Sequence, residues 1–277
     1  MKLSKIFALL LALCLISSAA CAATFTDAHG NVIELDDSLE AYAAVTLVGA
    51  DNAARQGETN LGDLWADALR WFAVSGEINT AFDEDDVKAG NDRIAVDADH
   101  VVALWNGGNL RADIAEGTFG AEALAEVLPF PNKVAVVYMT GEQLAEALEA
   151  ASQALPCTNE SADACASFMQ VSGLVYTVDT TKEYDKGEAY GDLWYQANSV
   201  NRVTVESVNG QPFDAQALYA VVTSNANYNG MDSSYIFKAA AEANPHSAIT
   251  TAVVRDVVWQ YIAEELNNQV TDAYAAP

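Results

Sequence analysis

The sequence predicts an α+β fold, in which a mixed β-sheet is covered by helices. Helical and strand patterns alternate irregularly along the chain, and two strand-like runs flank Asn209-Gly210, which is a strong signal for a tight hairpin turn. About half of the 277 residues (51%) are hydrophobic, so a sizeable core can form. This length suits one large domain or two small ones. The irregular alternation, with at least one hairpin, favours a mixed sheet packed against helices.

Residues 1–22 have the pattern of an export signal. Lys2 and Lys5 precede the apolar run IFALLLALCLI, and the small residues SSAACAA follow, with an A-x-A cleavage site before Ala23. The alternative is lipidation at Cys21, which follows two small residues. The apolar run is too short to span a membrane, and no later segment approaches that length. We therefore expect no transmembrane segment and a periplasmic or secreted location, or a lipid anchor at Cys21.

The mature chain is expected to begin with a hairpin segment over residues 23–44, which turns at DAHGN. A helix is predicted over 59–72, where apolar residues recur at helical spacing and Thr59 or Asn60 provides the cap. The run HVVALW (100–105) predicts a buried strand that ends in a glycine-rich loop.

The middle of the chain continues the alternation. GTFGAEALAEVLPF predicts a short helix that is capped by Thr118 and stops before Pro129, and a strand is expected at 133–139. Thr140 and Gln143 have the spacing of a capping box, which should begin a helix that reaches about residue 154.

The remaining elements close the predicted domain, which covers residues 45–268. Strands are expected at GLVYTVD, RVTVESV and YAVVTSN, and the last of these runs into a polar, Asn-rich loop. Residues 251–266 predict a closing helix with an apolar face, and residues 269–277 should form a loose tail.

Charge and cysteine content limit the classes of function. The formal net charge of -26 makes nucleic acid and anionic membranes poor candidates as partners, because both need clustered Lys and Arg. Cys157 and Cys165 predict a disulfide in an oxidising compartment, worth about 2–3 kcal/mol for such a short loop. His29, His100 and His246 are scattered singly, which does not indicate a metal site.

Two polar stretches have alternative interpretations. FDEDDVKAGND (82–92) could bind calcium weakly, but it lacks EF-hand spacing and is better explained as a solvated loop. TKEYDKGEAYGDLWYQANS (181–199) could be a surface loop or a contact site for a partner.

The candidate chemistry lies around LWNGGNLRADI (104–114). Gly107 and Gly108 would let a ligand approach the backbone, and the guanidinium groups of Arg55 and Arg111 suit bidentate contact with a phosphate or carboxylate. Salt bridges within an acidic protein would also explain both arginines. Phe130, held between two prolines, could stack on a planar ring or belong to the core. Asp232 could accept hydrogen bonds from sugar hydroxyls or lie in a solvated turn.

Six motifs in order resemble the C-terminal, substrate-recognising domain of the 5'-nucleotidase and UDP-sugar hydrolase family. They are RQGETNLGDLWADAL, WNGGNLRADI, GTFGAEALAEVLPFPNKV, MTGEQLAEALE, FMQVSGLVYTVD and YAVVTSNANYNGMD. The resemblance implies that Arg55 and Arg111 contact phosphate, Asn106 contacts the base, Phe130 stacks on the base and Asp232 holds the ribose. It therefore implies recognition of a nucleotide or nucleoside in nucleotide catabolism.

The chain departs from the family pattern at the second stacking position, where Ala226 stands in place of phenylalanine, with Tyr228 near enough to substitute. Met231 replaces the middle glycine of the usual G-G-D. Losing one face of a base clamp could cost about 1–3 kcal/mol.

The motifs of the family's metallophosphoesterase domain are missing, so we expect no catalytic residue, metal or cofactor in this chain. Hydrolysis would then need the metals of a separate metallophosphoesterase partner. The alternatives are a non-enzymatic, secreted binding module with a decayed nucleotide clamp and a hydrolase with an unrecognised site.

Overall fold

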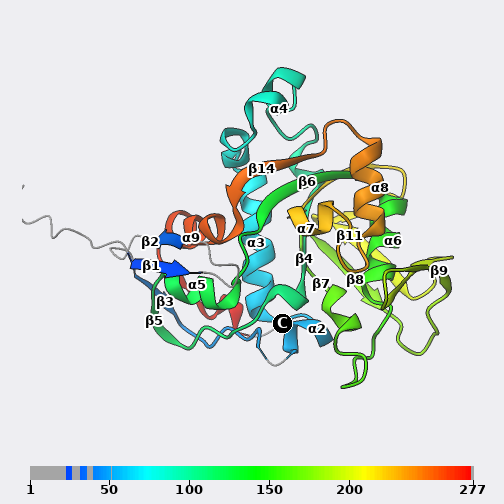
Figure 1. Cartoon of the computed structure of the whole chain (residues 1–277), viewed down its shortest axis with the longest axis horizontal. Coiled ribbons are helices and arrows are strands. Elements are labelled where there is room, and N and C mark those ends of the chain that lie inside the picture. Colours follow the sequence, from blue (N-terminus) through cyan, green and yellow to red (C-terminus); the bar gives the residue numbers. More distant parts are fainter. Residues whose placement is uncertain (1–22, 27–31, 36–39, 51, 276–277) are drawn as a thin grey trace, which may run out of the picture.

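A five-stranded mixed sheet forms the centre of the protein, in the order β14-β6-β13-β4-β7. The computed structural model describes residues 23–26, 32–35, 40–50 and 52–275. In the sheet, β13 runs parallel to β4, and the other neighbouring pairs are antiparallel. Helices α3 and α9 lie on one side, and α6 and α8 on the other (Figure 1). The predicted mixed sheet covered by helices is confirmed.

The elements of the main sheet and the helices have the following bounds. The main-sheet strands are β4 Val101–Asn106, β6 Lys133–Thr140, β7 Met169–Ser172, β13 Leu218–Ser224 and β14 Ala248–Val253. The α-helices are α2 Ala53–Gln56, α3 Asn60–Val74, α4 Glu84–Ala89, α5 Ala121–Val127, α6 Gly141–Ala151, α7 Asn225–Tyr228, α8 Tyr235–Ala243 and α9 Val254–Glu264. Short 3-10 turns are η1 Glu77–Thr80, η2 Ala98–His100, η3 Gly107–Asn109, η4 Ala164–Ser167 and η5 Asp272–Tyr274.

The other strands form small sheets. They are the pair β1 Ala23–Thr26 and β2 Val32–Leu35, the pair β9 Lys186–Tyr190 and β10 Trp194–Ala197, the set β12 Gln211–Pro212, β11 Val203–Val208 and β8 Leu174–Val178, and the set β15 Gln269–Val270, β3 Ala41–Ala43 and β5 Gly117–Phe119.

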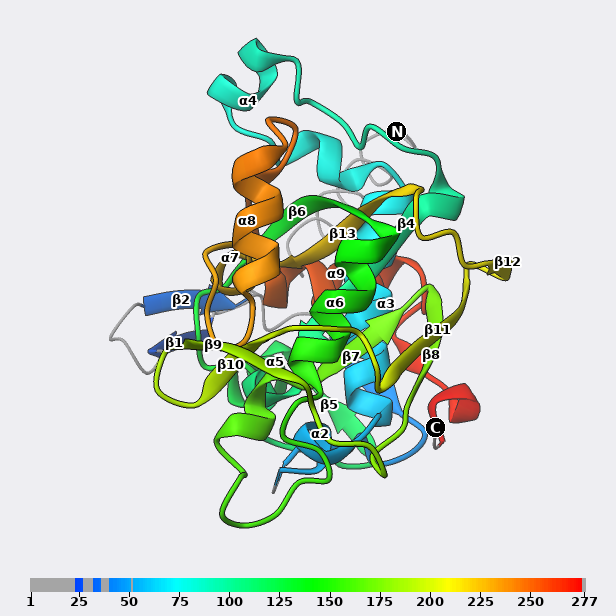
Figure 2. The same cartoon turned by 90° about the vertical axis from the view of Figure 1, so that its right-hand side faces the viewer.

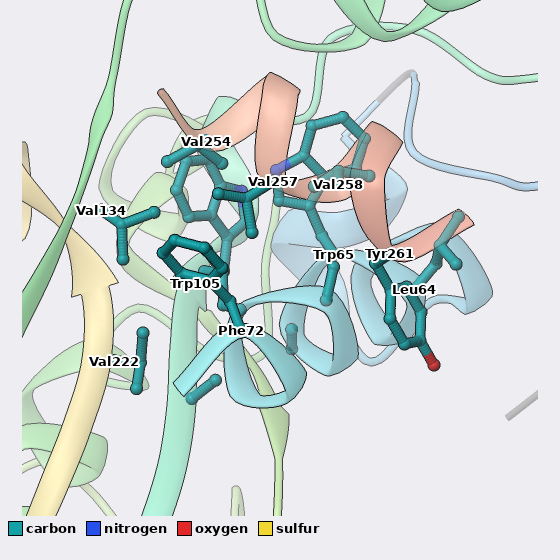
Figure 3. Close-up of a cluster of buried hydrophobic side chains, with 14 of the residues drawn as sticks. Leu64, Trp65, Phe72, Trp105, Val134, Val222, Val254, Val257, Val258 and Tyr261 are labelled. Atoms are coloured by element: carbon teal, nitrogen blue, oxygen red, sulfur yellow. The ribbon is translucent and has the colours of Figure 1, made fainter. Parts of the chain in front are cut away.

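Successive residues of the central strands alternate between two cores, as the pleat of a strand requires. In β4, Val101, Ala103 and Trp105 face α3 and α9, whereas Val102 and Leu104 face α6 and α8. We call the core on the α3 and α9 side the first core and the core on the α6 and α8 side the second core. Trp65 and Trp105 pack in the first core, with ring centroids 6.5 Å apart. Figure 3 labels both side chains. Burial on both faces explains why this strand has a continuous apolar run rather than an alternating pattern.

The capping signals placed two helices correctly. Thr59 caps α3 by accepting a hydrogen bond from the backbone amide of Gly62. Thr140 and Gln143 form the expected capping box of α6, although that helix ends at Ala151 rather than near residue 154. Thr118 was wrong as a cap: it lies in β5, and α5 begins after Gly120. The closing helix also begins later than expected, because residues 251–253 belong to β14.

Two buried charged side chains, Arg202 and Glu149, join the end of α6 to the start of β11 through hydrogen bonds to the backbone. Arg202, 1% exposed, donates from its guanidinium to the carbonyl oxygens of Ser152, Gln153 and Leu155. Glu149, fully buried, accepts from the backbone amides of Arg202 and the next residue through Oε2. These carbonyls follow the last residue of α6, and a cation beside a helix C-terminus is favourable because it interacts with the negative end of the helix dipole. The pair therefore fixes the start of the segment after α6.

The C-terminal tail, expected to be loose, is ordered as far as residue 275. β15 pairs in parallel with β3, and Asn60 Nδ2 donates to the carbonyl oxygen of Tyr274 at 2.9 Å. The hydroxyl of Tyr274 donates to Asp67 Oδ2 at 2.8 Å. The tail has only a weak hydrophobic periodicity, so its sequence did not predict these contacts, which are made to residues far away in the sequence. The folded unit therefore extends beyond residues 45–268 at both ends.

Some expectations lie at or beyond the edge of what the structure describes. The export signal and the DAHGN turn fall outside the described residues, although β1 and β2 do pair antiparallel on either side of that turn. In the described part of the chain, no helix is both long and apolar enough to cross a membrane. The acidic stretch 82–92, predicted to be a solvated loop, contains the short helix α4 at Glu84–Ala89, which has no buried residue and stands away from the sheet in both views (Figures 1 and 2).

Stability should fall as pH rises from about 4 to 7, because of Asp63 in the first turn of α3. Burial raises the pKa of Asp63 to about 7, helped by the nearby carboxylates of Glu58 and Asp67. Across this range the native state keeps a proton that the unfolded chain has lost, so folding binds protons and a pH increase destabilises it.

We expect Asp63→Asn to raise the melting temperature at pH 8 by about 2–4 °C and to leave it nearly unchanged at pH 4, as measured by calorimetry at both values. Asp192→Asn removes an exposed carboxylate and serves as the control. An equal shift at both pH values would contradict this explanation.

Candidate functional site

A cavity of about 680 Å³ opens at the edge of the main sheet where β4 and β13 end and β6 begins. Because β4 and β13 are parallel and β6 is antiparallel to β13, the loops at these three strand ends meet at one edge. The lining residues come from these loops and from η4: Asn106, Gly108, Asn109, Arg111, Phe130, Pro131, Asn132, Ala166, Asn225, Ala226, Asn229, Gly230, Met231 and Asp232. The fold thus brings together five predicted site residues, Asn106, Gly108, Arg111, Phe130 and Asp232.

A chain of hydrogen bonds fixes the polar side of the cavity. Asn109 Nδ2 donates to Asn106 Oδ1 at 2.8 Å, and Asn106 Nδ2 donates to Asp232 Oδ2 at 3.2 Å. Burial raises the pKa of Asp232, while Arg55, Arg111 and the hydrogen bond from Asn106 act in the opposite direction. The nearby cations and the amide donor favour the carboxylate form of Asp232, which can accept hydrogen bonds from a ligand hydroxyl.

The two glycines serve chain packing more than ligand access. A Cβ at Gly107 would overlap the carbonyl of Ala54 in α2, and one at Gly108 would lie 2.7 Å from the carbonyl oxygen of Ala166 in η4. Such contacts leave no space for a side chain. Gly108 also lines the cavity, whereas Gly107 does not. The pair therefore holds α2 and η4 against the end of β4, which was not apparent from the sequence.

Arg111 and Phe130 lie together on one wall. The guanidinium carbon of Arg111 is 5.6 Å from the centroid of the Phe130 ring, which is a cation–π contact. Burial of part of the side chain lowers the pKa of Arg111, and so does the charge of Arg55, whereas Asp232 and Asp163 raise it. Phe130 is half-buried and also packs against the core, so the core interpretation holds in part, while its position in the cavity wall leaves stacking on a ligand ring as a prediction.

Arg55 lies beside the cavity without lining it. Its Nη1 donates to the carbonyl oxygen of Ala162 at 2.8 Å and lies 3.7 Å from Asp163 Oδ1. The Asp163 side chain is 91% exposed, so this ion pair is weak and the backbone contact holds the arginine. Arg55 is close enough to Arg111 and Asp232 to shift the pKa of each.

The opposite wall is the segment from Asn225 to Asp232, which follows β13. Asn225 Oδ1 accepts from the backbone amide of Lys133 at 3.0 Å, which joins this wall to the start of β6. The backbone amide of Met231 donates to the carbonyl oxygen of Ala226 at 3.0 Å, so these two residues lie next to each other. Ala226 is 9% exposed, whereas Met231 is 54% exposed.

Tyr228 is absent from the cavity wall. Its hydroxyl donates to the carbonyl oxygen of Ser247 at 3.3 Å, and its ring packs against the second core. The prediction that Tyr228 replaces the missing stacking residue is therefore not supported by its position. Four further asparagines that were not among the predicted site residues also line the cavity: Asn109, Asn132, Asn225 and Asn229. The Asn-rich composition of the loop after β13 was a sequence signal for the last two.

Cys157 and Cys165 are free thiols in the structure, in contrast to the predicted disulfide. They lie near each other all the same: burial raises the pKa of Cys165 to about 11, and a hydrogen bond with Cys157 adds to the effect. The segment between them supplies the contacts of Arg55.

The described residues include no group of three or more His, Cys, Asp or Glu side chains that could hold a metal ion. His100 pairs with Asp97, and His246 contacts Asn91. His29 lies outside the described part of the chain.

Comparisons with known proteins point to one family. Residues 40–242 match the family model of the 5'-nucleotidase, C-terminal domain. The trifunctional nucleotide phosphoesterase protein YfkN of Bacillus subtilis (strain 168) is 30% identical over 202 residues, which are 72% of this chain and 11% of that protein. The cell wall protein Lmo0130 of Listeria monocytogenes is 31% identical over 191 residues, which are 66% of this chain and 19% of that protein. The chain thus spans a small part of these relatives.

Solved structures share the fold. The 5'-nucleotidase precursor from Thermus thermophilus superposes with a TM-score of 0.59 at 28% identity, over 86% of this chain and 37% of that one. The NAD nucleotidase of Haemophilus influenzae has a TM-score of 0.53 at 17% identity, over 83% and 36% of the two chains, and shows the fold alone.

The packing role of the first glycine can be measured directly. Gly107→Ala should lower the free energy of unfolding by about 1–3 kcal/mol or more, because the new methyl group would push α2 away from β4. Chemical denaturation gives this value.

Gly57→Ala is the matched control at the other end of α2. Gly57 has extended backbone angles, and a Cβ there would meet nothing within 4 Å, so stability should be unchanged or slightly higher. Equal effects of the two substitutions would show that the close approach is unimportant.

Proposed function

The chain belongs to the 5'-nucleotidase C-terminal domain family, and on that premise we propose that its cavity binds a nucleotide or nucleoside. The observation that supports this most is the convergence of three different groups at one cavity: the ring of Phe130, the guanidinium of Arg111 and the carboxylate of Asp232. They match in chemistry the three parts of a nucleotide, which are a planar base, a phosphate and a sugar. A cavity of about 680 Å³ is large enough for such a ligand.

Phosphate would bind at the two arginines. Arg55 and Arg111 are close enough that their charges repel each other, and this repulsion lowers the pKa of Arg111. An anion placed between them relieves that repulsion and gains charge-assisted hydrogen bonds. In a chain with a net charge of -26, such a pair is a local exception that favours an anionic ligand.

The sugar would bind at Asp232 and the base at Phe130. Asp232 accepts one hydrogen bond from Asn106, and a carboxylate has further lone pairs for ribose hydroxyls. To stack on Phe130, the base must displace Arg111 from the ring face. The released guanidinium would then be available for the phosphate. The second face of the base would be covered by Met231, the largest apolar side chain on the opposite wall.

Hydrolysis would depend on a metallophosphoesterase centre in a separate partner chain, and the domain would act in nucleotide catabolism outside the cytoplasm. A match to a cell wall protein supports a surface or extracellular location. The alternative is a binding module without a catalytic partner. The small side chain of Ala226, which leaves the clamp open on one side, favours it.

Calorimetric titration with AMP and adenosine tests the proposed site. We expect micromolar binding of AMP to the mature chain and weaker binding of adenosine, which lacks the phosphate. Phe130→Ala should weaken AMP binding roughly 5- to 150-fold, because stacking of a base on an aromatic ring contributes about 1–3 kcal/mol.

Tyr228→Phe is the control, because its hydroxyl bonds to Ser247 outside the cavity and its loss should leave affinity within about twofold. A folded sample that gives no heat with either ligand would rule the proposed site out.

The contribution of Met231 can be separated from that of the phosphate site. Met231→Ala should weaken AMP binding roughly 2- to 12-fold, as expected for loss of a thioether–ring contact, and leave ribose 5-phosphate binding unchanged. Val87→Ala, at a similarly exposed apolar residue of α4, should change neither. Equal losses for both ligands would mean that the substitution disturbs the loop and that Met231 does not contact the base.

A further inference from the structure

The hairpin of β9 and β10 forms a two-stranded sheet of its own, beside α6 and α8 and outside the main sheet. Its sequence suggested a surface loop or a contact site for a partner. Two of its aromatic side chains, Tyr190 and Trp194, reach the two loops that border the cavity.

Tyr190, the last residue of β9, contacts the wall after β13. Its hydroxyl donates a 2.6 Å hydrogen bond to the carbonyl oxygen of Gly230. Gly230 and Asp232 both have positive φ angles, of 84° and 56°, so this wall has backbone conformations that most residues avoid. The Tyr190 ring also packs against Tyr235 at the start of α8, with centroids 5.7 Å apart. Tyr190 thus ties the residue two before Asp232 to a helix.

Trp194, the first residue of β10, contacts the other loop that borders the cavity, which contains η4. Its indole Nε1 donates to the carbonyl oxygen of Ala164 at 3.1 Å. Ala164 begins η4, which carries Ala166 against Gly108. The residues just before it, Ala162 and Asp163, hold Arg55. The hydrogen bond from Trp194 therefore connects the hairpin to the segment that contacts Arg55, the arginine on the proposed phosphate side.

The hairpin itself is anchored to regular structure. The backbone amide of Tyr195 donates to Gln153 Oε1 at 3.0 Å, just after α6. The backbone amide of Ala197 donates to the hydroxyl of Tyr235 at 2.9 Å, and that hydroxyl donates to Glu146 Oε1 of α6 at 2.7 Å. Because α6 and α8 pack in the second core, these hydrogen bonds connect the hairpin to helices with buried apolar contacts.

We propose that this hairpin is a positioning element of the binding site, with Tyr190 and Trp194 as positioning residues for its sugar side and its phosphate side. This inference rests on the proposed function for the identity of the ligand, but the contacts themselves do not depend on it. Each hydrogen bond holds a loop in the conformation that the ligand needs, so less ordering is left for binding to impose.

Affinity measurements on three variants test the proposal. Tyr190→Phe should weaken adenosine and AMP about equally, by roughly three- to tenfold, because Asp232 serves both ligands. Trp194→Phe should weaken AMP by a similar factor and adenosine much less, because Arg55 serves the phosphate. Tyr184→Phe is the matched control: its hydroxyl bonds to the carbonyl oxygen of Tyr195 within the hairpin region and touches neither loop. It should change stability without changing either affinity.

Hydrogen exchange of the free protein gives a readout that needs no ligand. Tyr190→Phe should speed exchange in residues 226–234, where the Met231 amide bonds to Ala226, and Trp194→Phe in residues 161–168, where the Cys165 amide bonds to Ser161. Wild type that binds no nucleotide would refute the proposed function, while selective exchange changes would still support the positioning role. Affinities and exchange rates that move no more than in Tyr184→Phe would overturn it.

Discussion

The close backbone contact at the end of β4 is the constraint on which the rest of the site depends. Gly107 lies against α2 and Gly108 against η4, at separations that only a missing side chain permits. This contact fixes the helix that carries Arg55 and the segment that binds it, relative to Asn106 at the end of the same strand. Without it, the arginine and the amide network would belong to independent loops. Because neither glycine has a side chain, α2 and η4 can pack against the end of β4, and this packing positions Arg55 relative to Asn106.

The charges of the site are interdependent. Burial acts against ionisation of both Arg111 and Asp232, and the groups restrain each other's shifts. Arg55 lowers the pKa of both groups, which disfavours the charged form of Arg111 and favours the charged form of Asp232. In a protein with a net charge of -26, the two arginines of this group give the cavity local positive charge, on which the proposed binding of an anionic ligand depends.

The packed layers and the loops of this protein have different roles. Two cores and the main sheet give rigidity, and the loops at one sheet edge supply the chemistry. Loops of this kind have few apolar contacts of their own, so they need outside support to keep a defined shape. Arg202 and Glu149 support the start of the loop after α6. The β9–β10 hairpin contacts that loop and also the loop after β13. The positions at which this chain departs from the family pattern, Ala226 and Met231, lie in the wall that follows β13.

The sequence alone determined the mixed α+β architecture, the capped starts of α3 and α6, the buried strands and five of the residues that line the cavity. These features are local, or they depend on motifs in which residue type and spacing carry the information, as at Thr140 and Gln143. Tertiary structure alone decided which segments approach the glycines, that Tyr228 points to Ser247, that the tail docks through Tyr274 and that Tyr190 reaches Gly230. Each of these depends on contacts between residues distant in the sequence, and no local periodicity encodes such distances.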